Sequence, residues 1–127
     1  MEGFIGFVVG IVAVVLFLAA GVPLALRIIA SDSAFGLRSA DTDGDTQIWH
    51  LANAAIGREL MLTAGVDLIL AIVALVYWGD KAVQTALVVA IVLVSGSGTC
   101  LAIARGLTTA RALGKAKQAF PAGSKRF

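Results

Sequence analysis

The chain has 127 residues, of which 59% are hydrophobic and 14% are charged. Soluble domains usually carry about 25% charged residues, so this composition excludes an ordinary water-soluble globule and indicates a membrane protein. The length allows one compact unit, and the single cysteine, Cys100, excludes an intrachain disulfide. The net charge is only +2.

Residues 4–26 carry no charge and form the first predicted transmembrane helix. At 1.5 Å per residue such a helix extends roughly 34 Å, enough to cross a hydrocarbon core of about 30 Å. A cleaved signal peptide is the alternative, but the segment lacks a positively charged start and its apolar run is too long. Gly6 and Gly10 form a GxxxG pair that permits close helix packing, although glycine is also common in membrane helices for other reasons.

Residues 27–59 form the only long polar interval between apolar segments. Residues 31–44 are rich in Ser, Asp and Gly and predict a loop. From Asp45 onward, apolar residues recur at steps of three and four. This period predicts an amphipathic helix that continues into the second transmembrane helix, residues 60–78.

The acidic run of residues 41–45 is similar to ligand positions one, three and five of an EF-hand calcium loop. However, Thr46 stands where that loop needs a glycine for its sharp turn, and Ala52 stands where it needs a bidentate glutamate. Without these residues a cation would be held weakly. The sequence therefore predicts that Asp43 or Asp45 caps the following helix, and no calcium site.

Asp67 lies inside the second predicted span. A carboxylate at helix-centre depth costs about 2.5 to 3.5 kcal/mol on insertion scales and commonly marks function. If the membrane begins nearer to Ala64, Asp67 is interfacial and unexceptional, and both interpretations stay open. The predicted partner of Asp67 is Arg27, Arg58 or a hydroxyl group within residues 95–99.

The third predicted span, residues 82–104, is uncharged. Its centre contains small residues that suit close packing against another helix, namely Ser95, Gly96, Gly98 and Thr99. Residues 105–127 form a basic tail, whose Ala and Leu content predicts that the third helix continues beyond the span until Pro121.

The distribution of basic residues predicts the orientation. With three spans, residues 27–59 and 105–127 lie on one side of the membrane and hold every Lys and Arg except Lys81. The positive-inside rule places that side in the cytoplasm and the N-terminus outside. The predicted fold is an all-α integral membrane protein with three transmembrane helices, the second extended by a cytoplasmic amphipathic segment.

The sequence contains no arrangement of residues that is typical of catalysis, so we expect that the protein is not an enzyme and binds no cofactor. His50 and Cys100 are the only soft metal ligands apart from thioethers, and they lie on different elements. A zinc site needs three or four ligands, so we expect no metal. The basic tail lacks the interleaved aromatic residues of nucleic-acid binders, and contact with anionic lipid explains its charge.

Two short motifs carry a resemblance. Residues 36–39 read Gly-Leu-Arg-Ser, and Trp49, Asn53 and Gly57 follow at four-residue spacing, which places these three on one helix face. The Gly36–Arg38 turn followed by this face resembles the hallmark of the SdpI family of small bacterial membrane proteins. The topology is similar over residues 4–104, and the motif over residues 36–57.

The chain also departs from the pattern of that family. Family members often have Thr-Pro after the arginine, where Ser39 and Ala40 stand here. They often have an asparagine at the position of Asp32 and a basic residue at the position of Ala54. With three predicted spans, the chain is also shorter than the founding type, which has extra N-terminal spans.

The resemblance implies a protein of the bacterial inner membrane that acts by binding, in immunity to a secreted peptide toxin or in signal relay through a transcriptional repressor. An alternative is a small accessory subunit of a larger respiratory or transport assembly, which the small-residue faces suit. A proton pathway through Asp67 is a weaker third hypothesis, because one acidic residue makes no relay. The expected partners are the lipid bilayer, another membrane protein or a second copy, and a peptide toxin.

Overall fold

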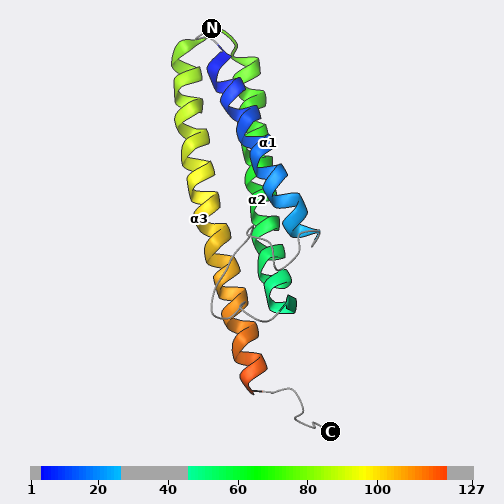
Figure 1. Ribbon diagram of the computed structural model, residues 1–127. Helices are drawn as coiled ribbons and strands as arrows, with labels where there is room; N and C mark the ends of the chain where they lie inside the picture. Colours follow the sequence, from blue (N-terminus) through cyan, green and yellow to red (C-terminus); the bar gives the residue numbers. More distant parts are fainter. Residues whose placement is uncertain (1–3, 27–45, 120–127) are drawn as a thin grey trace.

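The computed structural model describes residues 4–26 and 46–119, which fold into three helices (Figure 1). Helix α1 spans Ile5–Ala25, α2 spans Thr46–Val76 and α3 spans Lys81–Ala119. Each of the three is long and apolar enough to cross a membrane. The prediction of an all-α chain with three such helices is confirmed. Gly36, Arg38 and the acidic run of residues 41–45 lie outside the described residues.

The three helices run antiparallel to their neighbours in the sequence, with α2 in contact with both others (Figure 1). Along α1 and α2, Gly6 lies near Ala74 and Gly21 lies near Gly57. The α2–α3 contacts follow the same antiparallel order, from Asp67 with Ser95 to Glu59 with Arg105. The N-terminus and the α2–α3 turn therefore share one end of the bundle.

Helix α2 is continuous through the predicted boundary at residue 60, as expected from the absence of any helix-breaking residue. Its first part differs from the amphipathic surface helix that the apolar period predicts. Ala52, Asn53, Ala54, Ala55, Ile56 and Gly57 are all buried, so this part of the helix is covered around its circumference. The reason is the small side chains, which let α1 approach at Gly57 and place Ala110 of α3 against Ala52.

The α2–α3 connection is a tight turn around Gly79 and Asp80. Gly79 has a φ of +91°, a left-handed conformation that glycine adopts without steric cost. Asp80 then caps α3, because its Oδ1 accepts a hydrogen bond from the backbone N–H of Val83 at 3.2 Å. The turn thus fixes the antiparallel pairing of α2 and α3.

Helix α1 presents one buried face, at Gly6, Gly10, Val14, Gly21 and Leu24. Large apolar side chains on its other side are exposed, such as Val15 at 58% and Leu16 at 63%. The helix ends two residues after Pro23, which lacks a backbone donor and disturbs the preceding turn. An exposed face this apolar is suited to hydrocarbon and not to water.

Candidate functional site

The Trp49–Asn53–Gly57 face is buried between the helices. Trp49 and Asn53 each have 1% of their surface exposed. The Asn53 Nδ2 donates a hydrogen bond to the carbonyl oxygen of Trp49 at 2.8 Å, and the Trp49 ring meets the edge of His50 with centroids 5.0 Å apart. Trp49 and Asn53 therefore lie in the interior of the bundle, where a partner in solution cannot contact them directly.

Gly57 lies in close contact with the C-terminal end of α1. A Cβ atom built on Gly57 would lie 2.5 Å from the carbonyl oxygen of Gly21 and would collide with the backbone nitrogen of Ala25. A Cβ on Gly21 would in turn lie 2.9 Å from the carbonyl oxygen of Gly57. The two glycines thus form a reciprocal backbone contact that no larger residue permits.

Gly6 and Gly10 are both packing residues at the other end of α1. A Cβ on Gly10 would lie 2.7 Å from the Cβ of Ala71, and one on Gly6 would lie 2.7 Å from the Oε1 of Gln84. Gly6, Gly10 and Gly21 together form a line of close approach along α1. The GxxxG pair is the part of this line that the sequence motif predicts.

Asp67 is fully buried, with 0% of its surface exposed. Its Oδ2 accepts a hydrogen bond from the Ser95 hydroxyl at 2.9 Å. Of the partners that the sequence suggests for Asp67, the structure shows a hydroxyl group, that of Ser95. Arg58 is exposed, and Arg27 lies outside the described residues. The Asp67 Oδ1 has no hydrogen-bond partner among the described residues, so only one of the two carboxyl oxygens is hydrogen-bonded there.

The small-residue segment of α3 divides into two faces. On the α2 side, Ser95 bonds to Asp67, and a Cβ on Gly98 would collide with the side chain of Thr63. The Thr99 hydroxyl is used within the helix, donating to the carbonyl oxygen of Ser95 at 2.8 Å. Gly96 lies on the opposite side, where an added Cβ would meet no atom of the described residues within 4 Å. Gly96 thus takes no part in this packing contact.

Gln84 is a buried polar residue that the sequence analysis does not single out. Its Oε1 accepts a hydrogen bond from the backbone N–H of Gly6 at 2.9 Å. Its Nε2 donates to the carbonyl oxygens of Ala74 at 2.7 Å and Tyr77 at 3.1 Å. The first N–H groups of a helix and its last carbonyls lack partners within the helix, so one side chain of α3 satisfies the ends of both α1 and α2.

An aromatic cluster closes the same end of the bundle. Trp78 stacks on Phe4 with ring centroids 5.0 Å apart and an interplanar angle of 9°, and it contacts Phe7 with centroids at 6.3 Å. Trp78 and Tyr77 remain about half exposed, at 54% and 52%. Half-exposed Trp and Tyr side chains at the end of an apolar helix are typical of a membrane–water interface.

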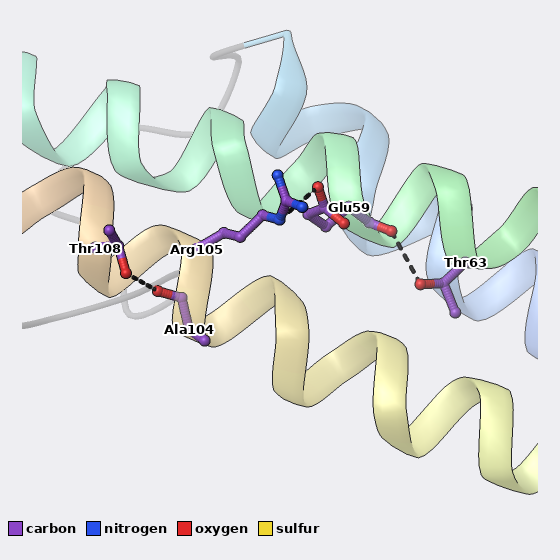
Figure 2. Close-up of polar contacts among 5 residues, drawn as sticks. All are labelled: Glu59, Thr63, Ala104, Arg105 and Thr108. Carbon is purple, nitrogen blue, oxygen red and sulfur yellow. Dashed lines mark hydrogen bonds and ion pairs between the residues drawn. The ribbon is translucent and has the colours of Figure 1, made fainter.

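An ion pair joins α2 and α3 toward the other end. Figure 2 shows the Arg105 side chain reaching from α3 to Glu59 on α2, and the Nε to Oε1 distance is 3.1 Å. The side chain of Glu59 is 15% exposed and that of Arg105 is 60% exposed. The carboxylate of Glu59 is thus mostly covered, whereas the guanidinium of Arg105 faces outward.

Two hollows lie on either side of this ion pair, and Glu59 lines both. An open apolar groove of about 460 Å³ runs between α2 and α3, lined mainly by Leu62, Val66, Leu93 and Leu101. A polar pocket of about 320 Å³ is lined by Arg58, Arg105, Thr108 and Thr109. The sequence analysis missed this site, because its residues lie on two helices and become adjacent only through their packing.

The described residues do not bring metal ligands together. Within residues 4–26 and 46–119, no group of three His, Cys, Asp or Glu side chains could hold a metal ion. Cys100 is an exposed free thiol. No family model, curated protein or solved structure matches the chain. The geometry above is therefore the basis for any functional proposal.

Proposed function

We propose that the protein is a three-span protein of the bacterial inner membrane, with its N-terminus outside and its C-terminus in the cytoplasm. It acts by binding, as an SdpI-like immunity or signal-relay protein. The observation that carries the proposal is the locked contact of Gly57 with Gly21 and Ala25, which buries the Trp49–Asn53–Gly57 face.

The distribution of charge supports the membrane placement. Helix α1 carries no charge, α3 carries none between Lys81 and Arg105, and α2 carries only Asp67 between Glu59 and Asp80. The stretch from Lys81 to Arg105 extends roughly 36 Å in a helix, close to a hydrocarbon thickness of about 30 Å. Arg58, Arg105 and the basic residues that follow then mark the cytoplasmic interface.

The way the polar side chains are used supports a binding role. Gln84, Asp67 and Asn53 are buried and hydrogen-bonded to other helices or to their own helix. The Gly57 contact fixes the C-terminal end of α1 against α2, and residues 27–45 join that end of α1 to Thr46, where α2 begins. The segment that carries the Gly36–Arg38 motif is therefore joined at both ends to helices that pack against each other, and binding loops are typically carried by such a rigid scaffold.

A capture experiment tests this function. The full chain is purified from its native cells in a mild detergent, and the proteins that co-purify are identified for the wild type, for Arg38→Ala and for Arg111→Ala. We expect a secreted peptide or a DNA-binding regulator, lost in Arg38→Ala and retained in the matched control Arg111→Ala. Capture that is the same in both variants contradicts the proposed role of the Gly36–Arg38 motif.

The second candidate function is that of an accessory subunit in a larger membrane assembly. The specific observation in its favour is the outward position of Gly96 on α3, where a further helix could approach closely. In the same experiment, a stoichiometric multi-subunit membrane complex supports this candidate and contradicts the first. Substituting Gly96 by leucine is then expected to release the complex.

A further inference from the structure

The apolar groove and the polar pocket are neighbours on the α2–α3 surface and differ in chemistry. They meet at Glu59, whose side chain lines both. From Glu59 to Val66 the groove follows α2 for roughly 10 Å, and it is walled on α3 by Leu93 and Leu101. An occupant of both parts therefore needs an extended apolar portion joined to a polar group.

The charges of the pocket favour an anion. Arg105 uses its Nε for Glu59, which leaves the two terminal nitrogens of the guanidinium directed away from that bond. Arg58 is exposed, and the part of the chain that the structure describes gives it no ion-pair partner. Two arginines against one carboxylate leave the pocket with a net positive charge. Planar guanidinium groups pair with phosphate by two parallel hydrogen bonds.

The depth of the site matches the position of a lipid headgroup. Arg58 and Arg105 lie at the end of the apolar band, in which Asp67 is the only ionisable acidic or basic residue of the described helices, and the groove extends from them back into that band. Glu59, which is largely covered, holds Arg105 at the mouth of the pocket (Figure 2). The polar end thus lies at the interface and the apolar end lies at the depth of acyl chains.

We infer that this α2–α3 groove is a binding site for an anionic phospholipid, with its phosphate at Arg58 and Arg105 and an acyl chain along Leu62, Val66, Leu93 and Leu101. The inference rests on the proposed membrane placement of the three helices, and it is independent of the immunity or relay function and of the side of the membrane on which the site lies. Each arginine near an anionic headgroup is expected to strengthen binding about five-fold.

The test uses the full chain purified in a mild, uncharged detergent. Its thermal unfolding midpoint is measured while phosphatidylglycerol is added, and phosphatidylcholine with the same acyl chains and inorganic phosphate serve as separate probes. We expect phosphatidylglycerol to raise the midpoint at the lowest concentration. An equal effect of phosphatidylcholine, or an equal effect of inorganic phosphate, overturns the proposal.

Three variants locate the effect. Arg58→Gln leaves the Glu59–Arg105 ion pair intact and is expected to need about five-fold more phosphatidylglycerol. Arg111→Gln removes an exposed arginine of α3 that does not line the pocket and is expected to behave as the wild type. Ser97→Phe fills the apolar groove without a change of charge and is expected to weaken the phosphatidylglycerol effect. Equal responses of Arg58→Gln and Arg111→Gln, or no effect of Ser97→Phe, overturn the assignment.

Discussion

Gly21 and Gly57 face each other across α1 and α2 so closely that each occupies the space where the other's Cβ would point. The built Cβ of Gly57 lies 2.5 Å from the carbonyl oxygen of Gly21, and that of Gly21 lies 2.9 Å from the carbonyl oxygen of Gly57. In membranes, where helices gain little from burying apolar surface against each other, such close backbone packing is a main source of association.

We therefore expect Gly57→Ala to separate α1 from α2. The added methyl group meets backbone atoms of Gly21 and Ala25, which cannot rotate away as a side chain could. Overpacking of this kind costs about 1–3 kcal/mol. The thermal unfolding midpoint in detergent is expected to fall. The control is Gly65→Ala on the same helix, where an added Cβ meets no described atom within 4 Å; equal midpoints for the two variants would contradict the close contact.

A second prediction concerns Gln84. The variant Gln84→Ala removes the acceptor of the Gly6 N–H and the donor to the Ala74 and Tyr77 carbonyls. Unpaired buried groups cost about 1–3 kcal/mol each, so unfolding in detergent is expected at a clearly lower temperature. The exposed neighbour Thr85, whose hydroxyl bonds only within its helix to the Lys81 carbonyl, provides Thr85→Ala as the control. A drop confined to Thr85→Ala is incompatible with this account.

A third prediction separates packing from function at Asp67. The variant Ser95→Ala leaves the buried Asp67 carboxyl without its hydroxyl partner and is expected to cost about 1–3 kcal/mol of stability. Asp67→Asn keeps a similar shape and a hydrogen bond to Ser95, so its unfolding midpoint is expected to stay near that of the wild type. Ser97→Ala, on the groove side of α3, is the control for loss of a hydroxyl.

The same Asp67→Asn variant can then be assayed for partner capture. Loss of capture at unchanged stability assigns the carboxyl group a functional role. Unchanged capture and expression assign it to the packing of α2 on α3. Substitution by leucine is not suitable for this purpose, because it removes the hydrogen bond and changes the packing at the same time.

A fourth prediction tests the orientation in the membrane. In a Cys100→Ser background, single cysteines are placed at two exposed positions of α3 by Ala82→Cys and Ala112→Cys. A membrane-impermeant maleimide added to intact cells is expected to label only Ala82→Cys, since the positive-inside rule places Lys81 outside and the basic tail inside. Labelling of Ala112→Cys alone would reverse the proposed topology.

The helices could be predicted from the sequence because each rests on a local signal. Long apolar segments indicated the three helices, the second of them despite the presence of Asp67. The partner of Asp67 was less determined, because hydroxyl and guanidinium groups at several positions could satisfy a carboxylate equally well. Only the register of α2 against α3 selects Ser95.

Other features depend on contacts between helices and leave no local signal. Gln84 looks like an ordinary polar residue in the first turn of a helix, yet its side chain bonds to the start of α1 and to the end of α2. Residues 52–57 are all buried, which differs from the amphipathic helix predicted for this segment. The prediction rested on apolar residues recurring along a single helix face, and such a pattern does not reveal that small alanines allow other helices to cover the remaining faces. The Glu59–Arg105 ion pair joins residues whose proximity follows only from antiparallel packing.

The hydrogen bond from Gly6 to Gln84 joins positions 78 residues apart. During synthesis the first span is complete long before the residue that caps its start has been made. In the proposed membrane placement, insertion and assembly are then separate events, as in a two-stage scheme. Helix α1 enters the bilayer before the Gly6 N–H has its partner, and the hydrogen bond forms only when α3 arrives. A ribosome stalled before Gln84 would leave a nascent chain in which α1 is inserted but lacks the hydrogen bond between the Gly6 N–H and Gln84.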